Sequence, residues 1–176
     1  MKISILLPYK ENFSPEYPGA VSLFINDTTL ISRYKKYIKV YGSTDFKKIF
    51  KIPYVNIELK NRFIGSQSKK YISKFLQFEK KRESDIIEIH NRPIYLKILY
   101  FKLKKKSNFT LFFHNDPLSM EGSKTIADRK FLLKYCYRII FNSYWSRKRF
   151  LEGLENRFVN SEKLLVFFQS AAKGNI

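Results

Sequence analysis

The segment TLFFHNDP, residues 110–117, places three polar side chains directly behind four residues typical of a buried strand. They are His114, Asn115 and Asp116, and Pro117 after them indicates that the strand stops there. An imidazole can donate a hydrogen bond to an anionic oxygen while a neighbour holds its second nitrogen, and Asn115 or Asp116 could be that neighbour. The alternative is a turn that binds nothing, in which His114 ends the strand and Asp116 opens an Asx turn.

Two other polar clusters also follow strand-like runs. PYKENFSPEYPGA, residues 8–20, follows the first run, and HNRP, residues 90–93, follows the fourth. In an open parallel sheet the ligand lies beyond the carboxyl ends of the strands. The three clusters are therefore predicted to converge on one edge of the sheet and to form a binding site there.

The elements that would position these clusters alternate along the chain. Strands are predicted at 3–9, 37–42, 54–59, 85–90, 110–115, 138–143 and 164–169. Between them, helical periodicity is found in 19–35, 68–82, 125–137 and 144–154, with apolar stripes that include Leu30, Ile31, Phe78 and Ile126. This order predicts an α/β fold, a Rossmann-like parallel sheet with helices on both faces.

Composition limits the class of protein. A chain of 176 residues, 44% hydrophobic, is predicted to form one domain. Its single cysteine, Cys136, lies in an apolar run, so a disulfide framework is excluded and a reducing compartment is expected. No run approaches the roughly 18 apolar residues of a membrane span. The net charge of +19 would attract nucleic acid, anionic lipid or phosphorylated small molecules, and part of the lysine excess can reflect compositional bias.

Several common functional motifs are missing from the sequence. The six glycines never fall two apart, which excludes GxGxxG, and GSKT at 122–125 lacks the other features of a phosphate-binding loop. The two histidines, His90 and His114, have no zinc-ligand spacing, and no GxSxG occurs.

The three clusters, in this order, resemble the amino-terminal Rossmann-like domain of retaining GT-B glycosyltransferases. The resemblance runs from ISILLPY and the PGAV turn, through DIIEIHNRP and LFFHNDPLSMEGSKTIADR, to IIFNSYWSRKRFLEGL and the terminal LLVFFQS. It implies a domain over 1–169, with 170–176 as the start of an interdomain linker. The carboxyl-terminal nucleotide-binding domain, where the family carries two glutamates eight residues apart, would then be absent, because no such pair occurs here.

The resemblance also implies roles for individual residues. His114 would contact the donor sugar or its phosphates and act with Asp116 as a catalytic residue. The donor diphosphate would approach the backbone at Pro18, Gly19 and Ala20, where Ala20 replaces a second glycine common in the family, and Asn115 would assist. On the acceptor side we expect His90, Asn91 and Arg92. Lys124 and Arg129 could reach a phosphate, although a solvated surface is the simpler expectation.

The implied reaction transfers a sugar from a nucleoside diphosphate sugar to an acceptor such as a lipid-linked or envelope glycan, with retention. Positive groups and helix amino termini would stabilise the departing diphosphate, so no metal or other cofactor is expected. We expect the protein in the cytoplasm, and this half alone to be inactive. The rival hypotheses are a noncatalytic scaffold of the same fold and a basic nucleic-acid-binding module, the latter disfavoured by the placement of the polar clusters.

Residues 92–109, RPIYLKILYFKLKKKSNF, are the most membrane-like stretch. As an amphipathic basic helix they could contact anionic lipid at the inner face of the membrane. The alternative, which we prefer, is a crossover helix that packs its apolar side on the sheet.

Overall fold

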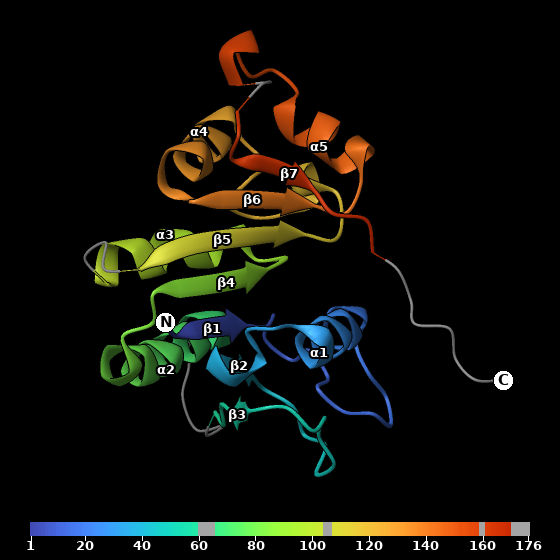
Figure 1. Cartoon of the computed structure of the whole chain (residues 1–176). Coiled ribbons are helices and arrows are strands. Elements are labelled where there is room, and N and C mark those ends of the chain that lie inside the picture. Colours follow the sequence, from blue (N-terminus) through green and yellow to red (C-terminus); the bar gives the residue numbers. More distant parts are fainter. Residues whose placement is uncertain (60–65, 104–106, 159–160, 170–176) are drawn as a thin grey trace, which may run out of the picture.

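The computed structural model describes residues 1–59, 66–103, 107–158 and 161–169 (Figure 1). Within them the strands form one sheet in the order β3-β2-β1-β4-β5-β6-β7, and every neighbouring pair is parallel. The strands are β1 (Ile3–Leu6), β2 (Ile38–Gly42), β3 (Tyr54–Asn56), β4 (Ile86–His90), β5 (Asn108–Phe113), β6 (Arg138–Phe141) and β7 (Leu164–Val166). The helices are α1 (Ala20–Ile31), α2 (Gln67–Arg82), α3 (Pro93–Lys102), α4 (Ile126–Tyr135) and α5 (Tyr144–Leu151), with short 3-10 turns η1 (Lys35–Tyr37), η2 (Pro117–Ser119) and η3 (Asn156–Phe158).

The predicted α/β class and all seven strands are confirmed. The strands are mostly shorter than predicted at their carboxyl ends: the runs 3–9 and 164–169 leave the ladder after Leu6 and Val166. Strand β3 stops at Asn56 and lies at the sheet edge, where only β2 pairs with it. The residues beyond each strand end form the loops of the candidate site.

The two faces of the sheet are covered unequally. Alternation along the strands sends Leu6, Ile87 and Leu111 into a large core shared with α2 to α5, whereas Ile5 and Val40 pack under α1 in a smaller one. On the α1 side, β6 and β7 leave apolar side chains open, and Leu165 of β7 is 43% exposed.

The order of strands reverses between β1 and β4, because the chain first moves outward through β2 and β3 and then returns to build on the other side (Figure 1). Such a switch point opens a crevice beyond the strand ends, since the loops on its two sides diverge. The loop into α1 and the short connection from β4 to α3 flank this crevice.

Some predictions of which apolar residues are buried were wrong. Ile31 is 86% exposed, and Leu30, Phe78 and Ile126 are also exposed. Helix α1 ends at Ile31 instead of continuing to 35, so the last apolar residues of its stripe lie beyond the part that packs on the sheet.

The preferred interpretation of residues 92–109 is confirmed for its apolar side. Helix α3 begins at Pro93, a residue favoured in the first helical turn, and buries Tyr95, Leu96 and Leu99 against the sheet. Lys104 to Lys106 lie outside the described residues. None of the described helices is both long and apolar enough to cross a membrane.

Candidate functional site

His114 follows β5 at the carboxyl edge of the sheet and is held from several directions. Its backbone N–H donates to Asn91 Oδ1 at 2.8 Å, and its carbonyl accepts from Asn142 Nδ2 at 2.7 Å. Its ring meets the edge of Phe24 from α1, with 5.2 Å between ring centroids. The backbone of His114 is therefore held by the loops after β4 and β6, and its ring packs against α1.

The neighbours of the His114 ring differ from those predicted. His114 Nε2 lies 2.8 Å from His90 Nδ1, and His114 Nδ1 contacts the side-chain amide of Gln169. The sequence analysis offered Asn115 or Asp116 as a neighbour of the ring, but His90 and Gln169 take that place. Two histidines 24 residues apart are neighbours because β4 and β5 pair in parallel, with His90 opposite Phe112.

The hydrogen-bonded chain continues inward from His90. His90 is fully buried, stacks on Phe112 and places Nε2 2.7 Å from Glu88 Oε1. Burial lowers the pKa of His114 from 6.5 to about 3, with a further decrease from His90 and an opposing contribution from Gln169. His114 is therefore a neutral imidazole near pH 7.

The turn at 18–20 starts α1, as predicted. Gly19 is the N-cap and Ala20 the first helical residue; neither has a side-chain oxygen to cap the helix. The required oxygen comes from Glu11 instead, whose Oε1 accepts from the Ser22 N–H at 3.2 Å. A Cβ on Gly19 would lie 1.9 Å from that same Oε1. The absence of a side chain at Gly19 thus lets the Glu11 carboxylate approach the start of α1. A phosphate bound at this helix end would have to displace the carboxylate.

The turn and His114 lie on one rim of the molecule. Phe24, which touches the His114 ring, is in the second turn of the helix that begins after Pro18 and Gly19. Helix α1 therefore brings its first two turns close to the His114 ring, whereas a common ligand for the turn and the imidazole stays a prediction.

Asn91, Arg92 and Asn115 line a different cavity of about 440 Å³, bounded by the first turns of α2 and α3 and by the loop after β5. Lys69 and Tyr95 also line it. Asn91 connects the cavity to His114, because Asn91 lines the cavity and its Oδ1 accepts from the His114 backbone N–H. Asn91 has a φ of 50°, a left-handed conformation that asparagine tolerates better than most residues.

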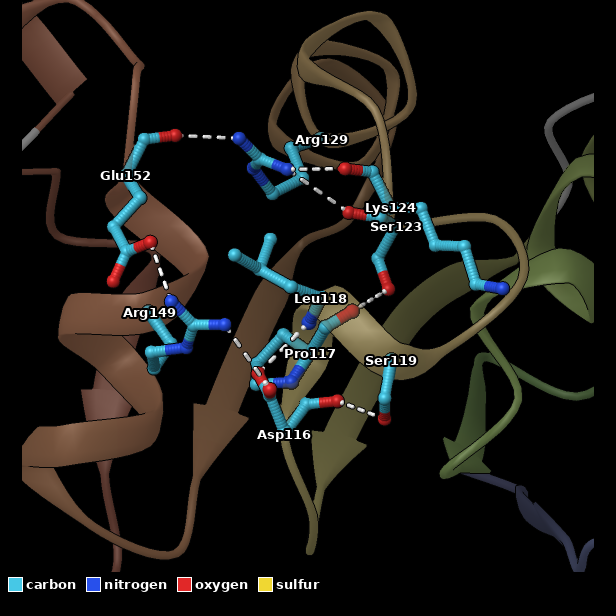
Figure 2. Close-up of polar contacts among 9 residues, drawn as sticks. All are labelled: Asp116, Pro117, Leu118, Ser119, Ser123, Lys124, Arg129, Arg149 and Glu152. Atoms are coloured by element: carbon cyan, nitrogen blue, oxygen red, sulfur yellow. Dashed lines mark hydrogen bonds and ion pairs between the residues drawn. The ribbon is translucent and has the colours of Figure 1, made fainter.

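Asp116 faces away from His114. Its Oδ1 accepts from the Leu118 N–H at 3.0 Å, which closes the Asx turn considered above, and its Oδ2 lies 3.3 Å from Arg149 of α5 (Figure 2). Helix α5 covers the sheet face opposite α1, because its Phe150 packs on Phe113 and Phe141. Asp116 and His114 are two residues apart in the sequence but point to opposite sides of the sheet.

Arg129 is a structural residue. The simpler expectation of a solvated side chain was wrong, since Arg129 is 3% exposed. Its guanidinium donates to the carbonyls of Ser123 at 3.2 Å, Lys124 at 2.8 Å and Glu152 at 2.5 Å (Figure 2). It thereby ties the loop before α4 to the end of α5.

Comparison with known proteins connects this geometry to a fold family. No protein-family model and no curated protein matches the chain. Among solved structures, HepE from Anabaena, with UDP and glucose bound, aligns at 18% identity and a TM-score of 0.62 over 96% of this chain and 44% of HepE. The lipopolysaccharide outer core galactosyltransferase WaaB aligns at 17% identity and 0.60 over 100% of this chain and 48% of WaaB.

The fold is that of a GT-B Rossmann-like domain. This chain spans less than half the length of either protein, which agrees with one GT-B domain out of two. UDP-N-acetylglucosamine 2-epimerase from Rickettsia bellii has a similar fold, at 12% identity and a TM-score of 0.55 over 94% of this chain and 44% of the epimerase. A GT-B domain therefore supports more than one reaction, and the site must carry the functional argument.

Two residues of the candidate site escaped the sequence analysis. Glu88 carried a usable signal, because two-residue alternation along IIEIH puts Glu88 and His90 on the same face of β4. Gln169 carried none, since its contact with His114 joins residues 55 positions apart. Within the described ranges no three His, Cys, Asp or Glu side chains are grouped in a way that could hold a metal ion.

Proposed function

We propose that the chain is the amino-terminal, acceptor-side domain of a glycosyltransferase that moves a sugar from a nucleoside diphosphate sugar to an acceptor hydroxyl, with retention. The observation that carries the proposal is the neutral, anchored His114 imidazole at the carboxyl edge of the sheet, on the same rim as the amino terminus of α1. The GT-B fold adds support, because HepE holds UDP and glucose.

The residues suit this chemistry in different degrees. The amino terminus of α1 attracts anions, and its present occupant is the Glu11 carboxylate. A donor phosphate could take that place if Glu11 moves aside. Asp116, engaged with Leu118 and Arg149, supports the loop that presents His114 and is a poor candidate for direct contact with the sugar.

The cavity near Asn91, Arg92 and Asn115 is the place we propose for the acceptor. It lies next to His114, and Lys69 and Arg92 provide positive charge for an acceptor that carries phosphate, as lipid-linked glycans do. A lipid-linked acceptor would also give the basic surface of the protein a role, because such a surface attracts an anionic membrane. The location of the protein in the cytoplasm stays a prediction.

A carboxyl-terminal partner domain would provide most of the nucleotide contacts, so this domain alone should bind donor weakly. The test is a titration of isotopically labelled chain with UDP-glucose, followed by amide NMR. We expect saturable chemical-shift changes at residues 18–24 and 114–116. They should disappear in His114→Ala and persist in Lys124→Ala, a control at an exposed residue of the loop before α4.

The rival hypotheses give other outcomes in the same experiment. A nucleic-acid-binding module would bind duplex DNA or RNA with a steep dependence on salt and without competition from UDP-glucose. A scaffold would show a folded spectrum that neither ligand perturbs. Shifts that remain unchanged in His114→Ala would contradict the proposed role of His114.

A further inference from the structure

Glu88 occupies the inner end of the chain of contacts that leads to His114. It lies on β4 two residues before His90, on the same face, and its Oε1 is 2.7 Å from His90 Nε2. We propose that Glu88 is a positioning residue that fixes the proton on Nε2 of His90 and, through His90, on Nε2 of His114. The position of these protons does not depend on the proposed function. Only the statement of which ligand His114 binds rests on that function.

The direction of each hydrogen bond follows from the partners. An ionised carboxylate can only accept, so His90 donates from Nε2, and the Nδ1 of a neutral His90 is then an acceptor. His114 Nε2, 2.8 Å away, must therefore carry the proton that it donates to His90. The remaining nitrogen, His114 Nδ1, presents a lone pair, which agrees with the amide N–H of Gln169 as its present partner.

Among the residues that the structure describes, no other charged side chain contacts the ring of His90 or the ring of His114. Ile5 and Thr110 flank Glu88 on the neighbouring strands. Helix α1 brings Asp27, whose carboxylate accepts from Asn26, and β6 brings Arg138, whose guanidinium donates to the Glu162 carbonyl. Glu88 is thus the charged group in position to select the tautomers.

The consequence concerns the chemistry of the ligand. The outward nitrogen of His114 accepts a hydrogen bond, and the low pKa of this imidazole keeps it from gaining a second proton near neutral pH. His114 would then take a hydrogen-bond donor such as a hydroxyl group, in the place that the Gln169 amide now fills, and would repel a phosphate oxygen. The proposal therefore differs from our expectation from the sequence that the imidazole donates to an anionic oxygen.

The experiment is long-range ¹H–¹⁵N NMR on histidine-labelled chain without ligand, so its outcome does not depend on donor binding. In the wild type near pH 7 we expect the proton that each ring donates within this network to be on Nε2. In Glu88→Leu, whose apolar side chain suits the surrounding Ile5 and Phe112, the ratio of the two His90 tautomers should shift about tenfold or more, equivalent to ~1.4 kcal/mol. Glu88→Gln, whose amide can accept from His90 but can also donate to it, should shift the ratio less than Glu88→Leu does.

Each result bears on the proposal. Identical tautomers in Glu88→Leu and wild type would overturn it, because the carboxylate would then select nothing. A cationic His90, or a proton on His90 Nδ1, in the wild type would overturn it whether or not Glu88→Leu folds. If the tautomers behave as expected but UDP-glucose never binds, the positioning role stands and the proposed function fails.

Discussion

The close contact between Gly122 and helix α3 makes a sharp prediction about stability. Gly122 has a φ of 91°, and a Cβ added there would lie 2.5 Å from the Ile94 nitrogen, 2.7 Å from Ile94 Cα and 2.9 Å from the Pro93 carbonyl carbon. All three are backbone atoms at the start of a buried helix, so no side-chain rotation can relieve the overlap. The glycine of the GSKT segment is therefore explained by its close packing against the backbone of α3.

The loss in free energy of unfolding that we expect for Gly122→Ala has two parts. A non-glycine residue in a left-handed conformation costs about 1–2 kcal/mol, and forced overlap in a packed region costs about 1–3 kcal/mol more. The sum of roughly 2–5 kcal/mol is a large fraction of the 5–15 kcal/mol that stabilises an ordinary domain. Gly153→Ala is a matched control, because Gly153 has a φ of 71° but a Cβ there would meet only Ile126 side-chain atoms, the nearest at 3.3 Å.

The assay is urea denaturation of both variants and the wild type, monitored by circular dichroism, with thermal melts in parallel. Gly153→Ala should lose only the conformational part, leaving a gap of about 1–3 kcal/mol between the variants. For a chain of this size that gap corresponds to roughly 2–12 °C in Tm. Equal losses in the two variants would refute the reasoning, since the overlap with α3 would then cost nothing.

Three further predictions concern buried groups. Burial holds the pKa of His114 at about 3, while the unfolded value is 6.5, so the unfolded chain binds the proton first as pH falls. The free energy of unfolding should therefore fall between about pH 6.5 and pH 3, by up to roughly 1.4 kcal/mol per pH unit. Denaturation at several pH values should show a flatter profile in His114→Asn, and parallel profiles in the variant and the wild type would contradict the assignment. Arg129→Met should destabilise the chain by about 3 kcal/mol in urea titrations because carbonyls that Arg129 satisfies lose their donor, whereas Lys124→Met, on the exposed side of the same loop, should change little. Burial raises the pKa of the Cys136 thiol, so a thiol reagent near neutral pH should modify it no faster than the chain unfolds; rapid modification of the native chain would show that Cys136 is accessible.

The sequence predicted the parts of the fold that depend on local pattern. Two-residue alternation and helical stripes identified seven strands and the helices between them, and the polar clusters at 8–20, 90–93 and 114–125 were correctly placed behind strands. Their common edge follows from parallel topology alone. Pro117 was likewise identified correctly as the residue behind the end of the strand, because backbone conformation at a proline depends on the residue itself.

Tertiary structure decided which side chains meet. Sequence placed His90 and His114 on neighbouring strands, but only the register of β4 against β5 brings Nδ1 of one to Nε2 of the other, above Glu88. His114 and Asp116, two residues apart, point to opposite faces once the strand ends, and Glu11 reaches Gly19 only because the loop folds back on itself. Local pattern fixes where a strand stops, whereas contacts between distant residues depend on register and side-chain direction, which the packing of the whole sheet determines.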